Sequence, residues 1–491
     1  MSDLVSVLVE AEAGAAAAVD TVPLAVDLDG CLVLTDTLYE SVIACLKQDP
    51  MSLFPLLLAL LRGRAAFKRA VAERARLDAE WLPYNQALLE YVARQREAGR
   101  RIGLFTAADQ SIADGVAEHL GFFDVARGSD GKVNLSGVRK LAAIRAAFGP
   151  TFAYVGNGSV DRPIFADAQR AILVGRVGRL RARLAPDKPV EATFAVRPPS
   201  PSEWLRAVRV QHWAKNLLVF VPLITGVQAV TLETVAQAAL LFLLLGMVAS
   251  ATYLINDSLD LTADRQHPKK RFRALAAGRV SIPGAAFASA GLLVTSYALA
   301  AWLLPIKAAA CLLGYLVLTL AYSLVLKRQP IIDVVTLAGL FTLRILAGSY
   351  IIPGPISPWL LTFSMLFFLG LAMVKRYAEL DRVTRAGRSG VASRGYMSED
   401  LALLLAAGLA SGFGAIIMFT IYLINEQYPR AAYQHPGFLW VMMPVLLIWL
   451  LRVWHLTLHG RMNEDPVVFA LKDRFSYGLG LIVAIVLLRA W

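Results

Sequence analysis

Three aspartates and a group of cations follow a long apolar stretch in the second half of the chain. Asp257, Asp260 and Asp264 are spaced i, i+3 and i+7, so a helix continuing from that stretch would place them on one face. Such carboxylates suit Mg²⁺, which completes its coordination with substrate phosphates. The cations that follow suit a diphosphate: Arg265, His267, Lys269, Lys270, Arg271 and Arg273. We predict a magnesium and diphosphate site here; the alternative is a solvated loop whose charge is incidental.

A second set of polar residues follows short apolar segments in the first half of the chain. The segment "TVPLAVDLDGCLVL" places Asp27 and Asp29 after an expected strand. One carboxylate could accept a phosphoryl group while the other serves as acid and base. Two further expected strands end in Thr106 and in the pair Asn157 and Asp161. The pattern predicts a phosphate site, and an ordinary acidic turn is the alternative.

The elements that position these residues are of two kinds. Of the 491 residues, 57% are hydrophobic and 18% are charged, which is typical of a membrane protein. Residues 1–200 have the mixed composition of a soluble domain, whereas the rest contains apolar stretches that could cross a bilayer. About nine such helices are expected, near 217–229, 233–255, 283–303, 306–326, 331–352, 358–374, 401–424, 438–456 and 477–490.

The basic residues predict the orientation in the membrane. The loops 256–282, 327–330, 375–400 and 457–476 hold most of the Lys and Arg, and nine spans put all four on the side of the N-terminal domain. The positive-inside rule makes that side cytoplasmic. We therefore expect a multi-pass protein of the inner (cytoplasmic) membrane, with its C-terminus on the outer side of that membrane. The net charge of +12 therefore requires no nucleic-acid partner. The first twenty residues lack the basic region of a secretory signal.

The membrane half resembles the UbiA superfamily of intramembrane prenyltransferases, whose bundles have nine helices. The motif "NDSLDLTADRQHP", which begins at Asn256, matches the NDxxDxxxD signature of that superfamily. The segments "RAVRVQHWAKNLLVFVPL", "HPKKRFRALAAGRV", "AYSLVLKRQPIIDVV", "FTLRILAGSY" and "NEDPVVFALKDR" resemble the decaprenyl-phosphate 5-phosphoribosyltransferases. The resemblance implies that Mg²⁺ on Asn256, Asp257, Asp260 and Asp264 holds phosphoribosyl pyrophosphate, which reacts with a polyprenyl phosphate.

One departure bears on the donor. Typical members carry a second aspartate-rich motif after the sixth helix, but this chain reads "MVKRYAELDR" there. Bases in place of acids favour a sugar phosphate over a prenyl diphosphate. The resemblance suggests a set of residues that bind phosphates or ribose, each except Arg344 with a topological or packing role as its alternative: Lys215, Asn216, Lys269, Arg271, Lys327, Arg344, Lys375, Arg376 and Tyr377. Arg344 lies within an apolar span, so it must face the bundle interior or a wet cavity.

The N-terminal half resembles the haloacid dehalogenase superfamily of aspartyl-phosphate phosphatases, which have an α/β Rossmann-type fold with a cap. The resemblance makes Asp27 the nucleophile and Asp29 the acid and base. Thr106 and Lys140 would bind the phosphoryl group. Mg²⁺ would lie on Asp27, Asp29, Asn157 and Asp161. Cys31 and Asn157 depart from the usual motif residues, so a binding-only domain is the alternative.

We therefore expect a tail at 1–20, a phosphatase-like domain at 21–175 with a helical cap near 37–100, a linker at 176–203 and a transferase domain at 204–491. The two halves together would make polyprenylphosphoryl ribose. A homo-oligomer is compatible with the sequence. The rival functions are an aromatic prenyltransferase that uses a polyprenyl diphosphate, with an accessory phosphatase-like domain, and a membrane-anchored scaffold with two inactive sites.

Overall fold

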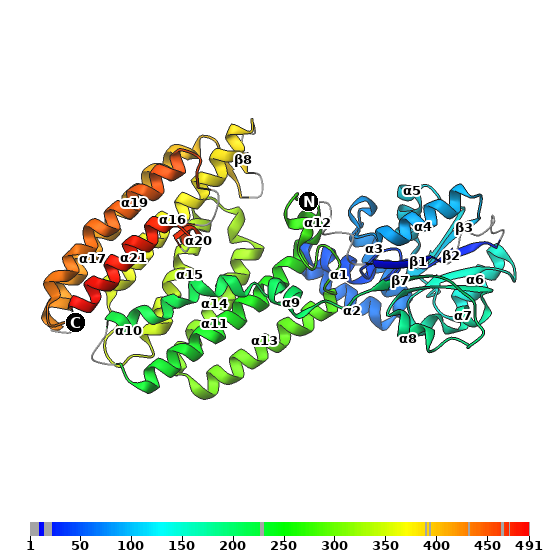
Figure 1. The fold of residues 1–491 in the computed structure, drawn as a ribbon, viewed down its shortest axis with the longest axis horizontal. Coiled ribbons are helices and arrows are strands. Elements are labelled where there is room, and N and C mark those ends of the chain that lie inside the picture. Colours follow the sequence, from blue (N-terminus) through cyan, green and yellow to red (C-terminus); the bar gives the residue numbers. More distant parts are fainter. Residues whose placement is uncertain are drawn as a thin grey trace. The chain divides into compact units, whose positions relative to one another are not determined.

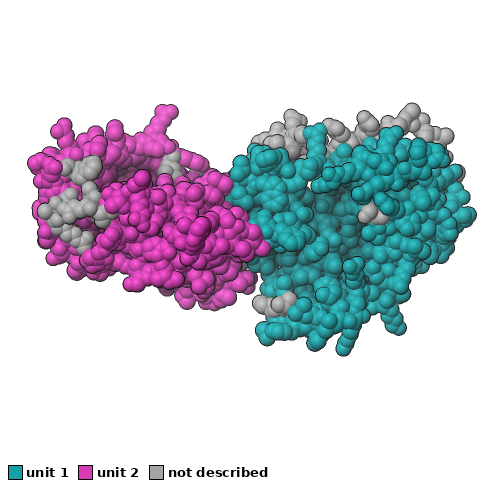
Figure 2. Space-filling model, turned by 90° about the horizontal axis from the view of Figure 1, so that it is seen from below, with its two compact units in different colours: residues 1–208, 254–288 teal, residues 209–253, 289–491 magenta. Residues whose placement is uncertain are grey.

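The chain forms two compact units, coloured separately in Figure 2. The computed structural model describes residues 9–13, 22–225, 230–387, 390–391, 394–430, 433–462, 466–470 and 472–490. Unit 1 consists of residues 1–208 and 254–288, and unit 2 consists of residues 209–253 and 289–491. The boundary falls inside α11 (Leu232–Leu259) and α13 (Ile282–Leu303), so the loop with the three aspartates belongs to unit 1.

Unit 1 contains a seven-stranded sheet with the order β1-β7-β6-β5-β2-β3-β4 (Figure 1). All neighbouring strands are parallel except the pair β1 and β7. The strands are β1 (Val9–Ala13), β2 (Leu24–Val26), β3 (Ile102–Asp109), β4 (Val125–Ser129), β5 (Ala153–Gly156), β6 (Arg170–Gly175) and β7 (Val190–Val196). This parallel sheet confirms the α/β class expected for the N-terminal half.

Helices cover both faces of the sheet, because side chains alternate along a strand. Leu24 and Val26 of β2 pack in one apolar core with α4 (Gln86–Glu97) and α5 (Gln110–Leu120). Ala25, between them, packs in the other core with α6 (Val138–Phe148) and α7 (Arg162–Asp167). Figure 1 shows α6 and α7 on the side of the sheet away from α4 and α5. The helices inserted between β2 and α4 are α1 (Thr37–Gln48), α2 (Leu53–Leu61) and α3 (Arg64–Arg74). This segment is helical, as predicted for the cap.

Residues 176–203 are not only a connecting segment. They contain α8 (Val177–Arg181), strand β7 and the start of α9 (Pro201–Ala207), and β7 pairs with both β6 and β1. Phe194 of β7 is buried in the sheet core. The prediction of a linker here is therefore wrong for 190–196, and β1 gives the expected N-terminal tail a strand as well.

Seven helices of the described residues are long and apolar enough to cross a membrane. They are α11, α13, α14 (Ile306–Leu324), α15 (Ile332–Ser349), α16 (Pro358–Arg385), α17 (Asp400–Tyr422) with the turn that extends it to Gln427, and the segment Pro436–Leu458, which contains α19 (Met442–Leu458). The other two expected spans correspond to α10 (Val221–Thr225) with the 3₁₀ segment Val210–Phe220, and to α21 (Arg474–Ala490). Residues 226–229 lie outside the described residues. The count of nine stays a prediction.

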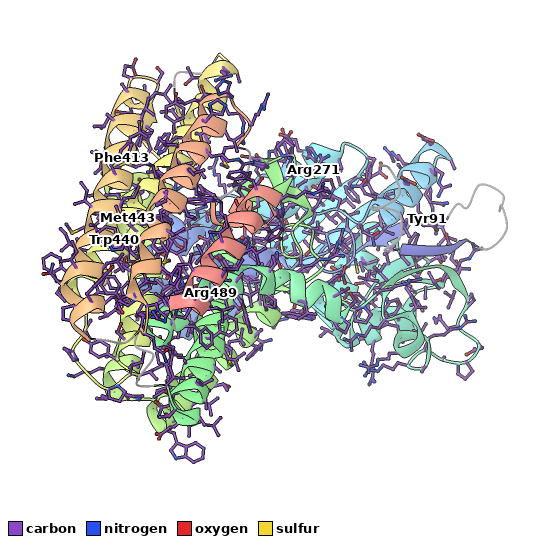
Figure 3. The ribbon with its side chains drawn as sticks, turned by 60° about the vertical axis from the view of Figure 1, so that its left-hand side comes forward. Tyr91, Arg271, Phe413, Trp440, Met443 and Arg489 are labelled. Atoms are coloured by element: carbon purple, nitrogen blue, oxygen red, sulfur yellow. The ribbon has the colours of Figure 1, made fainter. Side chains whose placement is uncertain are left out.

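The helices of unit 2 present large apolar side chains on their surface. Phe413 of α17 and Trp440 are 43% and 40% exposed, and both are labelled in Figure 3. Trp302 of α13 is 79% exposed. Side chains of this kind are stable on a surface that faces lipid, so the helical unit has the surface of a membrane bundle.

Candidate functional site

The polar residues of the N-terminal half lie at one edge of the sheet in unit 1. Strand β2 lies between β3 and β5, and its partners are both parallel to it. Carboxyl ends of parallel strands meet at a common edge, where α/β folds bind their ligands. Asp27 directly follows β2, Thr106 lies late in β3 and Asn157 directly follows β5. The sheet therefore brings three of the residues predicted for the phosphate site to one edge.

Lys140 of α6 joins the two carboxylates at the centre of this edge. Its Nζ lies 2.8 Å from Asp27 Oδ1 and 3.5 Å from Asp161 Oδ1. The hydroxyl of Tyr154 donates to Asp161 at 3.0 Å and contacts Lys140 Nζ at 3.3 Å. Burial alone would lower the pKa of Lys140, but the charges of Asp27 and Asp161 outweigh it and raise that pKa. The lysine is therefore charged, and its ammonium group contacts both the Asp27 and the Asp161 carboxylates.

Asp29 has the environment of a proton donor and acceptor. Its Oδ1 accepts a hydrogen bond from the backbone N–H of Thr37 at 2.8 Å. Burial, with a further contribution from the charge of Asp36, raises the pKa of Asp29 to about 7. A carboxyl group with that pKa exchanges protons readily near neutral pH.

Gly30 allows the loop after β2 to pass close to the loop after β5. Asn157 Nδ2 donates to the carbonyl oxygen of Asp29 at 3.0 Å. Gly30 has a φ of 68°, and a Cβ added there would lie 2.2 Å from Asn157 Nδ2. Both facts require glycine, because other residues adopt this φ rarely and would also clash.

Lys68 of α3 is a polar residue of this edge that the sequence motifs did not reveal. Its Nζ donates to the carbonyl of Ala107 at 2.6 Å and to Asn134 Oδ1 at 2.8 Å. Burial lowers the pKa of Lys68, although the charge of Asp29 opposes the change. Thr106 is buried, and its Oγ1 accepts the N–H of Ala108 at 3.0 Å. The lysine comes from the predicted cap, where no local pattern marks it.

The three aspartates of the second motif do not lie on one continuous helix. Asn256 and Asp257 lie in the last turns of α11, Asp260 caps the next helix, α12 (Leu261–Gln266), and Asp264 lies within it. Hydrogen bonds from Asp260 N to Asn256 O and from Asp264 N to Asp260 O keep the helical spacing across the break. The prediction of one continuous helix is corrected in this respect, because α11 ends at Leu259 and Asp260, with φ −101° and ψ 14°, separates it from α12.

Two of these aspartates face a common point. Arg273 Nη1 lies 3.1 Å from Asp257 Oδ1 and 2.6 Å from Asp264 Oδ2. Both aspartates are buried. Asp260 instead contacts Asn256 Nδ2 at 3.2 Å and Lys47 Nζ at 3.0 Å. A cation thus already bridges the first and third carboxylates of the motif.

The donor set is suited to Mg²⁺. Within the described part of the chain, no group of three or more His, Cys, Asp or Glu side chains is close enough to hold a metal ion. Mg²⁺ usually binds through one or two carboxylates and takes its remaining ligands from water and phosphate oxygens. Asp257 with Asp264, and Asp27 with Asp161, each provide two carboxylates around one cation, so both pairs fit such a site.

The cations after the motif divide into two groups. Arg265, which was expected to neutralise a diphosphate, donates Nη1 and Nη2 to the Glu40 carboxylate at 2.8 and 2.6 Å. Its Nε donates to Ala276 O at 2.9 Å. Each of its three guanidinium nitrogens donates within the protein, so that expectation is corrected. Lys269 and Arg271 are exposed and retain their predicted role; Arg271 is labelled in Figure 3.

Two of the predicted ligand-binding residues in unit 2 lie next to Phe341, and a third, Asn216, contacts one of them. Arg344 is buried, and its guanidinium lies 5.4 Å from the centre of the Phe341 ring. Arg344 Nε donates to Asn216 Oδ1 at 2.9 Å, and its Nη2 donates to the hydroxyl of Tyr315 at 3.0 Å. Lys215 Nζ lies 5.5 Å from the Phe341 ring centre. Arg344 faces the bundle interior, as expected for a cation within a span.

Arg376 lies in a buried ionic network. Its guanidinium donates to Asp333, to Glu379 Oε2 at 2.5 Å and to the hydroxyl of Tyr322 at 3.0 Å. The hydroxyl of Tyr396 donates to Asp333 at 2.6 Å. Asp333 and Glu379 therefore neutralise the positive charge of Arg376, a residue predicted to contact a phosphate. The neighbouring residues Lys375 and Tyr377, like Lys327, are partly exposed.

Residues 219–478 match the model of the UbiA prenyltransferase family. This match covers more than half of the chain, which therefore belongs to that family and is a multi-pass integral membrane transferase. Residues 21–175 lie outside the match.

Individual relatives extend this comparison. The uncharacterized protein y4nM of Sinorhizobium fredii is 39% identical over 468 residues, 94% of this chain and 90% of that protein. The decaprenyl-phosphate phosphoribosyltransferase of Mycobacterium tuberculosis is 31% identical over 281 residues, 56% of this chain and 90% of that enzyme. A solved UbiA homolog from Archaeoglobus fulgidus bound to GPP and Mg²⁺ is 17% identical with a TM-score of 0.45, covering 59% of this chain and 98% of that one.

Proposed function

We propose that the membrane half transfers a 5-phosphoribosyl group from phosphoribosyl pyrophosphate to a polyprenyl phosphate. The observation that supports this most directly is the similarity to decaprenyl-phosphate phosphoribosyltransferase over 90% of that enzyme's length. The basic segment at Lys375 supports the same donor, because it offers N–H groups where the superfamily resemblance predicts acids. An aromatic prenyltransferase would have no need of them.

The reaction requires a leaving group to be held and a nucleophile to be admitted. The bond from the anomeric carbon to the pyrophosphate oxygen breaks, and its electron pair leaves with pyrophosphate. An oxygen of the polyprenyl phosphate forms the new bond; it is already an anion, so no base is needed. Asp257 and Asp264, with Asn256 and Asp260, would hold Mg²⁺, which would stabilise the charge of the leaving group.

The remaining predicted residues would bind the donor and the acceptor. Lys269 and Arg271 are exposed beside the aspartate motif in unit 1, where they would contact phosphate oxygens. In unit 2 Lys215, Asn216 and Arg344 would serve the phosphates of either substrate. Arg344 would act through Asn216, because its three guanidinium nitrogens already donate to Asn216, to Leu340 O and to Tyr315. Lys327, Lys375, Arg376 and Tyr377 remain proposals for the same task, Arg376 through the network that fixes its side chain.

For the N-terminal domain we propose hydrolysis of a phosphomonoester, with the haloacid dehalogenase-like assignment of residues 21–175. The supporting observation is the single charged lysine held between Asp27 and Asp161 beside a carboxyl group, Asp29, whose pKa is about 7. Asp27 Oδ would attack phosphorus while the ester P–O bond breaks. Asp29 would donate its proton to the leaving oxygen and then take one from the water that hydrolyses the aspartyl phosphate. Thr106 and Lys140 would bind the phosphoryl oxygens, and Mg²⁺ would neutralise their charge.

The two activities form a sequence in one chain. The transferase would produce polyprenylphosphoryl 5-phosphoribose, and the N-terminal domain would remove its 5-phosphate to give polyprenylphosphoryl ribose. We place the N-terminal domain and the active-site loops of the transferase on the cytoplasmic side of the inner membrane, where the basic loops lie under the positive-inside rule.

A comparison of two donor and acceptor pairs, each supplied separately, tests the transferase proposal. Purified protein in detergent receives Mg²⁺ with either ¹⁴C-phosphoribosyl pyrophosphate and polyprenyl phosphate, or a labelled polyprenyl diphosphate and an aromatic acceptor. Labelled lipid from the first pair alone supports the proposal. Product from the second pair alone would establish the aromatic prenyltransferase instead.

A further inference from the structure

A buried ion pair connects helix α1 to the aspartate motif. Glu40 and Arg265 lie 225 residues apart in sequence, yet their side chains are 4% and 8% exposed and form two hydrogen bonds, at 2.8 and 2.6 Å. Removing two charges from water is unfavourable unless the geometry is good and the other donors are satisfied. Arg265 meets that condition through its third bond, to Ala276 O. The pair therefore fixes α1 against α12 in one arrangement.

A second, more accessible ion pair lies further along the same helix. Lys47 Nζ contacts Asp260 Oδ1 at 3.0 Å, and their side chains are 34% and 22% exposed. Lys47 is seven residues after Glu40, so both point from the same face of α1. Along the motif, however, Asp260 precedes Arg265. Helix α1 and the motif are therefore antiparallel. In one ion pair the acid belongs to α1, and in the other the acid belongs to the motif.

The ends of this contact are also defined. At the start of α1, Thr37 N donates to Asp29 Oδ1 at 2.8 Å. Gly278, after the motif, has a φ of 69°, and a Cβ added there would lie 2.9 Å from Leu34 Cβ. Helix α1 therefore begins at the phosphate site of the N-terminal domain and ends at the middle aspartate of the motif.

We infer that Lys47 binds the diphosphate leaving group of the transferase, and that the Glu40–Arg265 pair positions it. The inference rests on the proposed function, because that function supplies the diphosphate. Of the three motif carboxylates, Asp257 and Asp264 contact Arg273, whereas Asp260 contacts an ammonium from another part of unit 1. When Asp260 turns to a metal, Lys47 has three N–H donors beside the metal-bound phosphate oxygens.

This assignment explains why a soluble domain precedes the transferase. Lys47 lies outside residues 219–478, which match the family model. The N-terminal domain would thus complete the diphosphate site in addition to acting on the product.

Binding of inorganic pyrophosphate tests the inference without requiring turnover. Isothermal titration in the presence of Mg²⁺ uses the full chain carrying Asp27→Asn, which disables the N-terminal site. Further variants in this background are Lys47→Gln, Lys47→Arg, Asp260→Asn and, as a matched control, Arg145→Gln, which removes an exposed ion pair with Asp167 elsewhere in unit 1. Asp260→Asn should weaken binding and so locate it at the motif.

We expect Lys47→Gln to weaken pyrophosphate binding about tenfold, as for loss of one hydrogen bond to a charged group. Lys47→Arg should retain most of the affinity, and Arg145→Gln all of it. Equal affinities for Lys47→Gln and the background, or equal losses for Lys47→Gln and Arg145→Gln, would overturn the inference and leave the proposed function standing. No binding by the background protein would overturn both.

Discussion

Lys140 Nζ lies 2.8 Å from the carboxylate of Asp27, in a position where it also contacts Asp161. This arrangement brings together three segments, the ends of β2 and β5 and the helix between β4 and β5. It gives the N-terminal domain a charged, buried point at which a phosphoryl group and a metal could meet.

The first prediction concerns the nucleophile. Asp27→Asn keeps the size of the side chain but removes the charge that attacks phosphorus, so phosphatase activity should fall by at least about a thousandfold. Phosphoribosyl transfer should be unchanged. The measurement is release of phosphate from a soluble phosphate ester, with Asp130→Asn, in an exposed turn, as the control. Activity retained by Asp27→Asn would refute the assigned nucleophile.

Removal of Lys140 should destabilise the N-terminal domain. Lys140→Met leaves two buried carboxylates facing each other, and breaking a buried ion pair costs about 3–5 kcal/mol. Mg²⁺ should restore more stability to this variant than to the parent, because it replaces the missing charge. Hydrogen exchange of β2 and β5 measures the effect, with the exposed Lys132→Met as the control. Equal protection in both variants would contradict the electrostatic role.

The motif carboxylates should control transfer and not hydrolysis. Asp257→Asn removes one of the two carboxylates that face a common point, so transferase activity should fall by at least about a hundredfold. Raising the Mg²⁺ concentration should recover part of it. The exposed Asp187→Asn serves as the control. If the Asp257→Asn variant has the parent's activity at every Mg²⁺ concentration, the proposal that Asp257 binds Mg²⁺ is refuted.

A pH-dependent contribution to stability comes from Glu191 in β7. Arg100 is buried and donates to its carboxylate at 2.5 and 3.1 Å, and the hydroxyl of Tyr91, labelled in Figure 3, donates to it as well. Burial would raise the pKa of Glu191, but these hydrogen bonds outweigh it, so that pKa lies below its ordinary value of 4.5. The stabilisation is therefore complete above about pH 4.5 and is lost as the pH falls through the lowered pKa.

Glu191→Gln makes this contribution measurable. The variant should show weaker hydrogen-exchange protection in β7 than the parent at pH 7, since it removes the carboxylate charge that Arg100 and Tyr91 contact. The difference between the two proteins should shrink as the solution is acidified below pH 4.5. A difference that is the same at pH 7 and pH 3 would show that the ion pair contributes nothing.

Much of the N-terminal site could be predicted because its signals are local. An apolar strand followed by a polar residue, as at Asp27 or Asn157, defines both the strand and the edge at which that residue lies. The prediction of a linker at 176–203 is wrong for β7. Prolines flank this strand, and the alternation of its side chains, with Ala192 and Phe194 buried, extends over only a few residues.

Contacts between distant segments could not be predicted. Lys68 and the Glu40–Arg265 pair depend on how helices pack, and no spacing in the sequence encodes that packing. Arg265 and Arg376 show the limit of reasoning from charge, because a buried acid from another element contacts each guanidinium group, Glu40 for Arg265 and Asp333 for Arg376. The role of Arg376 at phosphate stays a prediction.

The most direct test of the account is a dual-label experiment. Purified protein receives polyprenyl phosphate, Mg²⁺ and phosphoribosyl pyrophosphate labelled with ¹⁴C in the ribose and ³²P in the 5-phosphate, and the lipid fraction is counted. We predict that ¹⁴C enters the lipid and that ³²P is then released, whereas Asp27→Asn retains both labels. Lipid that keeps its ³²P in the parent protein, or that never acquires ¹⁴C, would contradict the proposed sequence of reactions.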